Sequence, residues 1–298
     1  MKKLVKRHAP ASLQSWLRRT YYRFPVLRRL YYLPRDAGEW LARARGGNDR
    51  LRPPRSMIFV GDGDFDGVGR EYLGYFTGIA GLAPHERVLE LGSGIGRMAL
   101  PLTGYLDRSG SYEGLDIVAA GIRWCQKRIT PLFPNFHFQM ADVFNRQYNP
   151  KGRSPASAYR FPFVDNHFDF VFLTSVFTHM LPAEVENYLA EIARVLKPGG
   201  RCLATFFLLN REALSLLDSK PTRFRHPFQD CLVIDPQLPE ASIAHDEKRI
   251  RQNHQRCRLT IAEPIRYGSW CGRDRHLSYQ DIVLARKPAG RSQPIDRP

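Results

Sequence analysis

The sequence lacks the features that mark several classes of protein. No apolar run in its 298 residues approaches the roughly 20 residues that a membrane-spanning helix needs. Its five cysteines show no C-x-x-C spacing, which disfavours zinc ribbons and disulfide frameworks and fits a reducing cytosol. No apolar stretch with the length of a signal-peptide core follows the first lysines, so we expect no secretory signal.

Acidic residues are scarce in the first 55 residues. This segment contains fifteen Lys or Arg and three acids, and it therefore carries +12 of the chain's net charge of +16. Apolar residues recur at helical spacing over residues 13–24 and again over residues 26–31, with arginines elsewhere on the wheel. We expect residues 1–55 to form a basic amphipathic arm, whose residues 1–35 contact an anionic membrane surface. Packing on the body of the protein, nucleic acid and an organelle transit peptide are the alternatives.

A metal site is not expected either. Residues 62–67 imitate the start of an EF-hand calcium loop, but the twelfth position is Leu73 where a bidentate Glu is needed. We expect a turn there, followed by a helix over residues 70–80. Phe65 and Tyr72 would then lie near the ligand-binding half of the protein and could help to cover it.

Strand and helix patterns alternate from residue 87 onwards, which predicts a doubly wound α/β sheet. Strand patterns cover residues 87–91, 111–116, 136–140, 168–174 and 202–208, and helix patterns cover residues 97–106, 119–129 and 184–196. Residues 258–263 and 280–286 fit a final strand pair. Helices over 211–218 and 245–256 and a short strand over 231–234 are weaker candidates. We expect one domain over residues 56–288 and a flexible tail over residues 289–298.

Acidic residues lie at or just past the ends of three successive strand patterns. The first, Glu90, precedes three alternating glycines, which allow a sharp turn and let a ligand approach the main chain. Ligands of open parallel sheets bind at the carboxyl ends of the strands. Asp116 could there accept both hydroxyls of a ribose. Asp142 could accept an exocyclic adenine amine, beside the backbone N–H of Val143.

These stretches resemble the motifs of class I S-adenosylmethionine-dependent methyltransferases. Residues 90–96 (ELGSGIG) resemble the first motif, residues 114–116 and 141–143 the ribose and adenine motifs, and residues 163–171 and 194–200 the flanks of strands four and five. The resemblance implies a Rossmann-like sheet of seven strands with an antiparallel last strand, and S-adenosyl-L-methionine as cofactor. A dinucleotide is disfavoured, because its fingerprint is G-x-G-x-x-G and the chain reads G-x-G-x-G.

The resemblance also implies which residues hold the cofactor. Glu90 and the glycines would hold the methionine end, Asp116 the ribose and Asp142 the adenine. The complete set of expected cofactor-binding residues is Glu90, Gly92, Ser93, Gly94, Gly96, Arg97, Asp116, Ile117, Asp142, Val143, Thr174 and Ser175.

The acceptor end is expected on three other segments. His179, just beyond strand four, is the candidate catalytic base, and the alternative is a histidine that supports its loop or caps the next helix. Residues 145–160 exceed the usual link of the family, and we expect them to form a lid on the substrate side. Tyr148, Tyr159 and Trp270 are the candidate substrate contacts, although an ordinary surface hairpin would explain the segment around Trp270 as well.

Together these features predict a methyltransferase that is cytoplasmic, or peripheral to the inner face of a membrane. The expected reaction is O-methylation of a small-molecule, sugar or lipid-linked acceptor. RNA methylation with the arm on phosphates is one alternative, and a non-catalytic cofactor-binding scaffold subunit is another. The acceptor, the methylated atom and the oligomeric state are left open.

Overall fold

The computed structural model describes residues 32–34, 36–37, 51–58, 64–219 and 223–289. Most of the predicted basic arm and of the predicted tail therefore lies outside the described residues. Within the described ranges, no helix combines the length and the apolarity that crossing a membrane requires.

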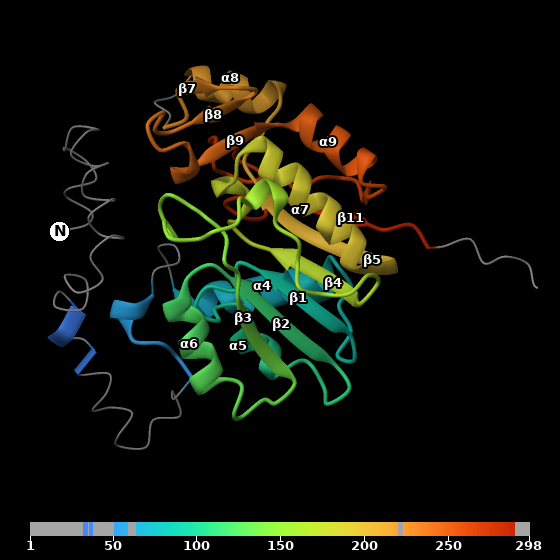
Figure 1. Cartoon of the computed structure of the whole chain (residues 1–298). Coiled ribbons are helices and arrows are strands. Elements are labelled where there is room, and N and C mark those ends of the chain that lie inside the picture. Colours follow the sequence, from blue (N-terminus) through green and yellow to red (C-terminus); the bar gives the residue numbers. More distant parts are fainter. Residues whose placement is uncertain (1–31, 35, 38–50, 59–63, 220–222, 290–298) are drawn as a thin grey trace, which may run out of the picture.

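The main sheet has seven strands and confirms the predicted fold class (Figure 1). Its strands are β1 (Arg87–Leu91), β2 (Ser111–Asp116), β3 (Phe136–Met140), β4 (Phe168–Leu173), β5 (Leu196–Phe206), β10 (Thr260–Ile261) and β11 (Asp281–Arg286). They are ordered β10-β11-β5-β4-β1-β2-β3. The pairs from β3 to β5 are parallel, whereas β11 is antiparallel to both β5 and β10. The last strand is thus antiparallel, as expected.

Helices cover both faces of this sheet, because side chains along each strand alternate between two buried clusters. Val88 belongs to the cluster that holds buried side chains of α4 (Phe65–Gly78), α5 (Ala99–Thr103) and α6 (Ala119–Arg128). Leu89, on the opposite face, belongs to the cluster built with α7 (Pro182–Val195) and α9 (Glu247–Arg256). The sequence therefore forms three layers with the sheet in the middle.

Several boundaries differ from the prediction. Helix α4 begins at Phe65 instead of residue 70, because the Asp64 side chain accepts the N–H of Asp66 and caps the helix. Helix α5 is shorter than expected and begins only at Ala99, since the glycine turn extends to residue 98. Strand β5 begins at Leu196, ahead of the expected residue 202, and Gly199 within it has a φ of +81°.

A second sheet lies between β5 and β10 in the chain, and the sequence did not predict it. Its strands are β6 (Leu208–Leu209), β7 (His226–Phe228), β8 (Cys231–Val233) and β9 (Ile243–Asp246), in the order β6-β9-β8-β7. Together with α8 (Arg211–Ser219) and α9 it forms what we call the accessory unit, residues 208–256, at the top of Figure 1. The strands have only two to four residues, too few to show a period-2 pattern. Helix α8, strand β8 and helix α9 confirm the three weaker candidates.

Short 3-10 helices also occur among the described residues. They are η1 (Arg55–Met57), η2 (Ala156–Ala158), η3 (Phe177–His179) and η4 (Pro239–Ala241). The third follows β4, and the fourth lies in the accessory unit. The contact between η3 and η4 links the main sheet to the accessory unit, just beyond the end of β4.

Candidate active site

The glycine turn brings the ends of three strands together. The N–H groups of Gly92 and Ser93 both donate to the carbonyl of Leu115 at the end of β2, at 2.7 and 3.2 Å. Gly92 has a φ of +82°, and a Cβ on it would lie 2.4 Å from Cγ2 of Val176, which follows β4. Only glycine fits this backbone conformation and this close approach.

Asp116 presents a preset carboxylate beside this turn. It is 7% exposed, and its two oxygens accept the N–H groups of Gly94 at 2.7 Å and Val118 at 2.6 Å. Burial raises the pKa of Asp116 to about 6, against these two hydrogen bonds, which lower it. Each oxygen retains a lone pair, so the ionised carboxylate can also accept the two hydroxyls of a ribose. Ile117 follows directly and packs against the core.

Glu90 lies beneath the turn and not at its surface. It is 2% exposed, and the Tyr112 hydroxyl donates to its Oε2. Burial raises the pKa of Glu90 to about 8, so the carboxyl is mainly protonated at neutral pH. The structure therefore shows Glu90 buried in β1 and bound to Tyr112 of β2, directly before the glycine turn, and its expected role at the methionine end stays a prediction.

Asp142 and Val143 follow β3, where the adenine motif was expected. Arg153 of the 145–160 insertion donates its Nε–H to Asp142 Oδ2 and its backbone N–H to Oδ1, at 3.2 Å for the latter. This pairing holds the pKa of Asp142 below its usual range. A bridge between Val143 and Ser154 uses the Asp142 carbonyl and the Phe144 N–H, which leaves the Val143 N–H outside it. An acceptor and a donor for an adenine edge thus lie side by side.

The insertion that contains Arg153 folds back on the domain. The side chain of Asn149 donates to the Val143 carbonyl, and Asn187 of α7 donates to the carbonyls of Ala156 and Tyr159, all at 2.9 Å. Tyr159 is half-buried in this packing. The insertion therefore borders the adenine motif at one end and covers α7 at the other.

Helix α4 borders the other side of the glycine turn. The Arg97 guanidinium lies over the Phe65 ring, 5.4 Å from its centroid, and burial lowers the pKa of Arg97. Tyr72, which lies in α4 like Phe65, interacts electrostatically with Arg97. The two aromatic residues thus lie at the ligand-binding half, where the sequence placed them.

The chain leaves β4 in a conformation that few side chains adopt. Ser175 has a φ of +59°; its N–H donates to Thr205 Oγ1 at 2.7 Å, and its hydroxyl donates to Gln280 Oε1 at 3.1 Å. Left-handed backbone outside glycine costs on the order of 1–3 kcal/mol and is concentrated at functional sites. Ser175 is therefore held against β5 and against Gln280, the residue before β11.

His179 ends η3, directly after this turn. Its Nδ1 lies 2.8 Å from the main-chain carbonyl of Glu240 in η4. A carbonyl only accepts, so Nδ1 carries the hydrogen and the lone pair of the neutral ring is on Nε2. The Tyr148 ring contacts the His179 ring edge to face, at 5.7 Å between centroids. Two residues predicted for the acceptor end are thus neighbours.

The accessory unit holds η3 by a second hydrogen bond. His245 Nε2 donates to the carbonyl of Phe177 at 2.8 Å, and Nδ1 lies 3.5 Å from the sulfur of Cys231. Burial lowers the pKa of His245 to about 4, so the ring stays neutral. His245 and Glu240 therefore fix the two ends of η3. Neither residue carries a sequence motif, and only the tertiary structure reveals their roles.

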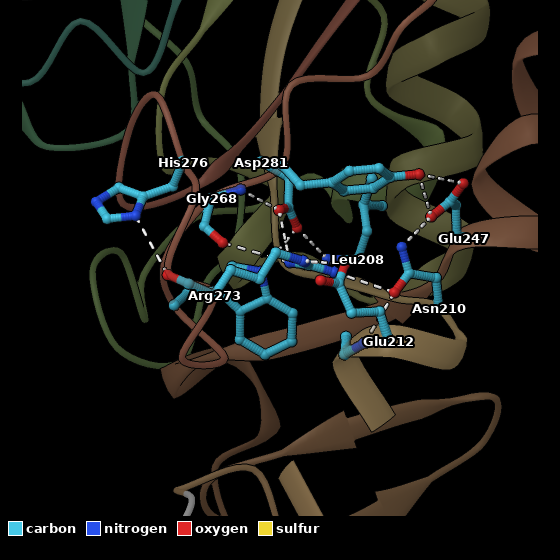
Figure 2. A network of polar contacts seen from close by, with 11 residues as sticks. Leu208, Asn210, Glu212, Glu247, Gly268, Arg273, His276 and Asp281 are labelled. Atoms are coloured by element: carbon cyan, nitrogen blue, oxygen red, sulfur yellow. Dashed lines mark hydrogen bonds and ion pairs between the residues drawn. The ribbon is translucent and has the colours of Figure 1, made fainter. Parts of the chain in front are cut away.

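Trp270 does not join the acceptor end. It is buried with Phe207 and Phe224, and its indole N–H donates to Asp281 Oδ2 at 2.8 Å. Trp270 was expected to contact the substrate, but it belongs to a buried network of polar contacts around Asp281 (Figure 2).

This network joins the two sheets through one carboxylate. Asp281, the first residue of β11, is fully buried and also accepts the N–H groups of Leu208 and Gly268, at 2.7 and 2.6 Å. Arg273 lies 3.4 Å from Asp281 and continues the network to Glu212 at 2.7 Å and, by way of Asn210, to Glu247 (Figure 2). Burial raises the pKa of Asp281 to about 6.

The residues of the turn fit an adenosine-type cofactor. Besides the Asp116 carboxylate and the Asp142–Val143 edge, Ser93 offers a buried hydroxyl with no hydrogen-bond partner among the described residues. Buried polar groups are rarely left unpaired, so a polar ligand at the turn accounts for this one. In the described ranges, no group of three or more His, Cys, Asp or Glu could hold a metal ion.

Comparisons with known proteins agree with this geometry. Residues 89–204 match the family model described as "Methyltransferase domain". The chain is 37% identical over 120 residues to a phthiotriol/phenolphthiotriol dimycocerosates methyltransferase of Mycobacterium ulcerans, covering 40% of this chain and 37% of that protein. It is 34% identical over 120 residues to a fatty-acid O-methyltransferase of Mycolicibacterium smegmatis, covering 40% and 36%. The chain thus matches little more than a third of the length of these relatives.

A solved structure supports the fold over a longer range. A protein from Pyrococcus horikoshii is similar to this chain with a TM-score of 0.53 at 16% identity, covering 81% of this chain and all of that one. Strand order, antiparallel last strand and strand-end acids define the class I methyltransferase fold. Residues 89–204 thus form a methyltransferase domain with the class I fold, and the residues at its sheet edge fit S-adenosyl-L-methionine as the cofactor.

Proposed function

We propose that the protein methylates a hydroxyl of a small-molecule, sugar or lipid-linked acceptor. The observation that carries this proposal is the position and tautomer of His179. Its Nδ1–H is bound to the Glu240 carbonyl at 2.8 Å, which puts the basic lone pair on Nε2. Val176, in the same segment, packs against the glycine turn, so the imidazole belongs to the cofactor edge.

Different residues at this edge would bind the cofactor and accept the proton of the acceptor. S-adenosylmethionine supplies an electrophilic methyl group on its sulfonium. Asp116 and the Asp142–Val143 edge would hold the ribose and the adenine. His179 Nε2 would accept the proton of the acceptor hydroxyl, and the Glu240 carbonyl would stabilise the imidazolium through Nδ1–H. Tyr148 would keep the ring in place from its edge.

The names of two relatives support an acceptor with a lipid part. One is a methyltransferase of phthiotriol and phenolphthiotriol dimycocerosates, and the other an O-methyltransferase of fatty acids. Methyl transfer is measured with S-adenosylmethionine labelled in its methyl group and a panel of hydroxylated lipids and sugars. His179→Gln should lower turnover by roughly 10²–10⁴-fold and leave cofactor affinity intact. Equal turnover of the variant and the parent would contradict the role of His179.

We further propose that the basic arm holds the protein at the cytoplasmic face of an anionic membrane. The arm's net charge of +12 and its two amphipathic segments support this location. Sedimentation with anionic liposomes should fall when residues 1–50 are removed. Equal sedimentation of both forms would contradict the proposal, and salt-sensitive binding of RNA that depends on the arm would favour nucleic acid instead.

A further inference from the structure

Three buried polar atoms without a partner among the described residues belong to segments that meet at His179. Thr178 Oγ1 and Glu240 Oε2 have no hydrogen-bond partner among the described residues, although Thr178 is only 1% and Glu240 only 7% exposed. The same holds for Oε1 of Gln147, the residue before Tyr148. Proteins leave few buried polar groups unsatisfied, because each one costs free energy. A polar ligand bound where these segments meet would satisfy them.

The three atoms come from three segments that meet at His179. Thr178 precedes His179 in η3, and Glu240 binds the His179 ring through its main-chain carbonyl. Gln147 lies in the insertion, beside the Tyr148 ring that contacts His179. The main domain, the insertion and the accessory unit therefore each contribute one polar group.

The chemistry of these groups restricts what they bind. A carboxylate oxygen only accepts hydrogen bonds, whereas a hydroxyl and an amide both donate and accept. A second carboxylate, Glu184, interacts electrostatically with Glu240, but its own Oε2 already accepts the Leu181 N–H at 2.7 Å. An anionic ligand would meet Glu240 in a site that is largely shielded from water, where like charges repel strongly.

We propose that Thr178, Glu240 and Gln147 form a headgroup site for an uncharged, polyhydroxylated group of the acceptor. Such a group supplies O–H donors to Glu240 and both donors and acceptors to Thr178 and Gln147. The site rests on the proposed function, because His179 marks the acceptor end. It deepens that function by selecting polyol or sugar headgroups over carboxylates.

The test compares three amphiphiles with one chain length and different headgroups. Monolauroylglycerol, lauric acid and dodecylamine are titrated calorimetrically into the full chain with bound S-adenosylhomocysteine, below their micelle concentrations. We expect monolauroylglycerol to bind at least about tenfold more tightly than lauric acid, because Glu240 accepts a hydroxyl and repels a carboxylate. Equal or tighter binding of lauric acid, tightest binding of dodecylamine, or no binding of monolauroylglycerol would each overturn the proposal.

Substitutions then test whether the headgroup site causes the preference for monolauroylglycerol over lauric acid. Glu240→Gln removes the charge but keeps the main-chain bond to His179, and should reduce the preference over lauric acid at least fivefold, or roughly 1 kcal/mol. Thr178→Val keeps the shape and should weaken monolauroylglycerol binding severalfold. Glu186→Gln, an exposed position on α7, is the matched control and should change neither value. An unchanged preference in folded Glu240→Gln, or unchanged monolauroylglycerol binding in Thr178→Val, would overturn the site.

The two proposals fail in different ways. Loss of methyl transfer in all assays, with headgroup preference intact, would contradict the proposed function but leave the site. Methyl transfer that depends on His179, without any headgroup preference, would contradict the site alone.

Discussion

Protonation of Asp116 should weaken cofactor binding as the pH falls below about 6. Burial raises the pKa of this carboxyl to about 6, although Gly94 and Val118 donate to it. Its ionised form can accept both ribose hydroxyls, whereas a protonated carboxyl has lost part of its acceptor capacity. Because the free protein takes up the proton at a pH where an exposed Asp is still ionised, a ligand that needs the carboxylate must displace that proton.

The magnitude follows from one titrating group. Below about pH 6 the affinity should fall by up to about tenfold per pH unit, so the loss between pH 7 and pH 5 should be roughly tenfold. Asp116→Asn removes one charged hydrogen-bonding partner and should weaken binding at pH 7 by about 1.5–3 kcal/mol, or roughly 10- to 150-fold. Calorimetric titration with S-adenosylmethionine, in steps from about pH 5 to pH 7.5, measures both effects.

The Asp116→Asn variant is also the control for the pH effect. It keeps the shape of the side chain and any pH dependence that arises in the ligand or elsewhere in the protein. Glu90 does not interfere, because its pKa of about 8 leaves it mainly protonated across the acidic half of this range. An affinity of the parent protein that is flat between pH 7 and pH 5, or a slope shared with Asp116→Asn, would refute the reasoning.

Three further predictions concern stability. The folded-state pKa of Glu90 is raised from 4.5 to about 8, so its contribution to stability is present below pH 4.5 and lost as the pH rises towards 8. The melting temperature of Glu90→Gln should therefore rise relative to that of the parent protein between pH 5 and pH 8. An equal difference in melting temperature at both pH values would contradict this. Arg273→Ala should cost about 3–5 kcal/mol in urea unfolding, because it leaves the buried Asp281 carboxylate without its cationic partner, whereas the exposed control Arg275→Ala should cost little. A loss of less than about 1 kcal/mol would show that Arg273 is dispensable. Gly92→Ala should cost about 1–3 kcal/mol and weaken cofactor binding, with partial rescue by Val176→Ala; retention of full affinity would show that the turn adapts.

The cofactor half could be predicted because its signals are local. Each strand of the parallel sheet shows its own apolar run, Asp116 is the last residue of β2, and Asp142 comes just past the end of β3. Parallel strands then carry these acids to one edge of the sheet without further information. The antiparallel last strand, now seen as β11, was predicted only through the resemblance to the methyltransferase family, because the strand pattern itself carries no direction.

The acceptor half was predicted only in part, since its contacts are long-range. His179 and Tyr148 were chosen separately, but their ring contact spans the insertion and β4. Trp270 was expected to contact the substrate, but its indole N–H binds the Asp281 carboxylate at the start of β11, a contact that no local pattern records. Glu240 acts through its main chain, which no sequence pattern records.

The shared carboxylate of Asp281 has a consequence for how the protein unfolds. The same side chain binds the N–H of Leu208, in the first strand of the accessory unit, and the hairpin before β11, which closes the main sheet. Opening either sheet at this point exposes a charge that both have buried, so neither opens alone at low cost. The accessory unit and the cofactor domain should therefore melt in one cooperative transition, and not as two bodies with separate stabilities.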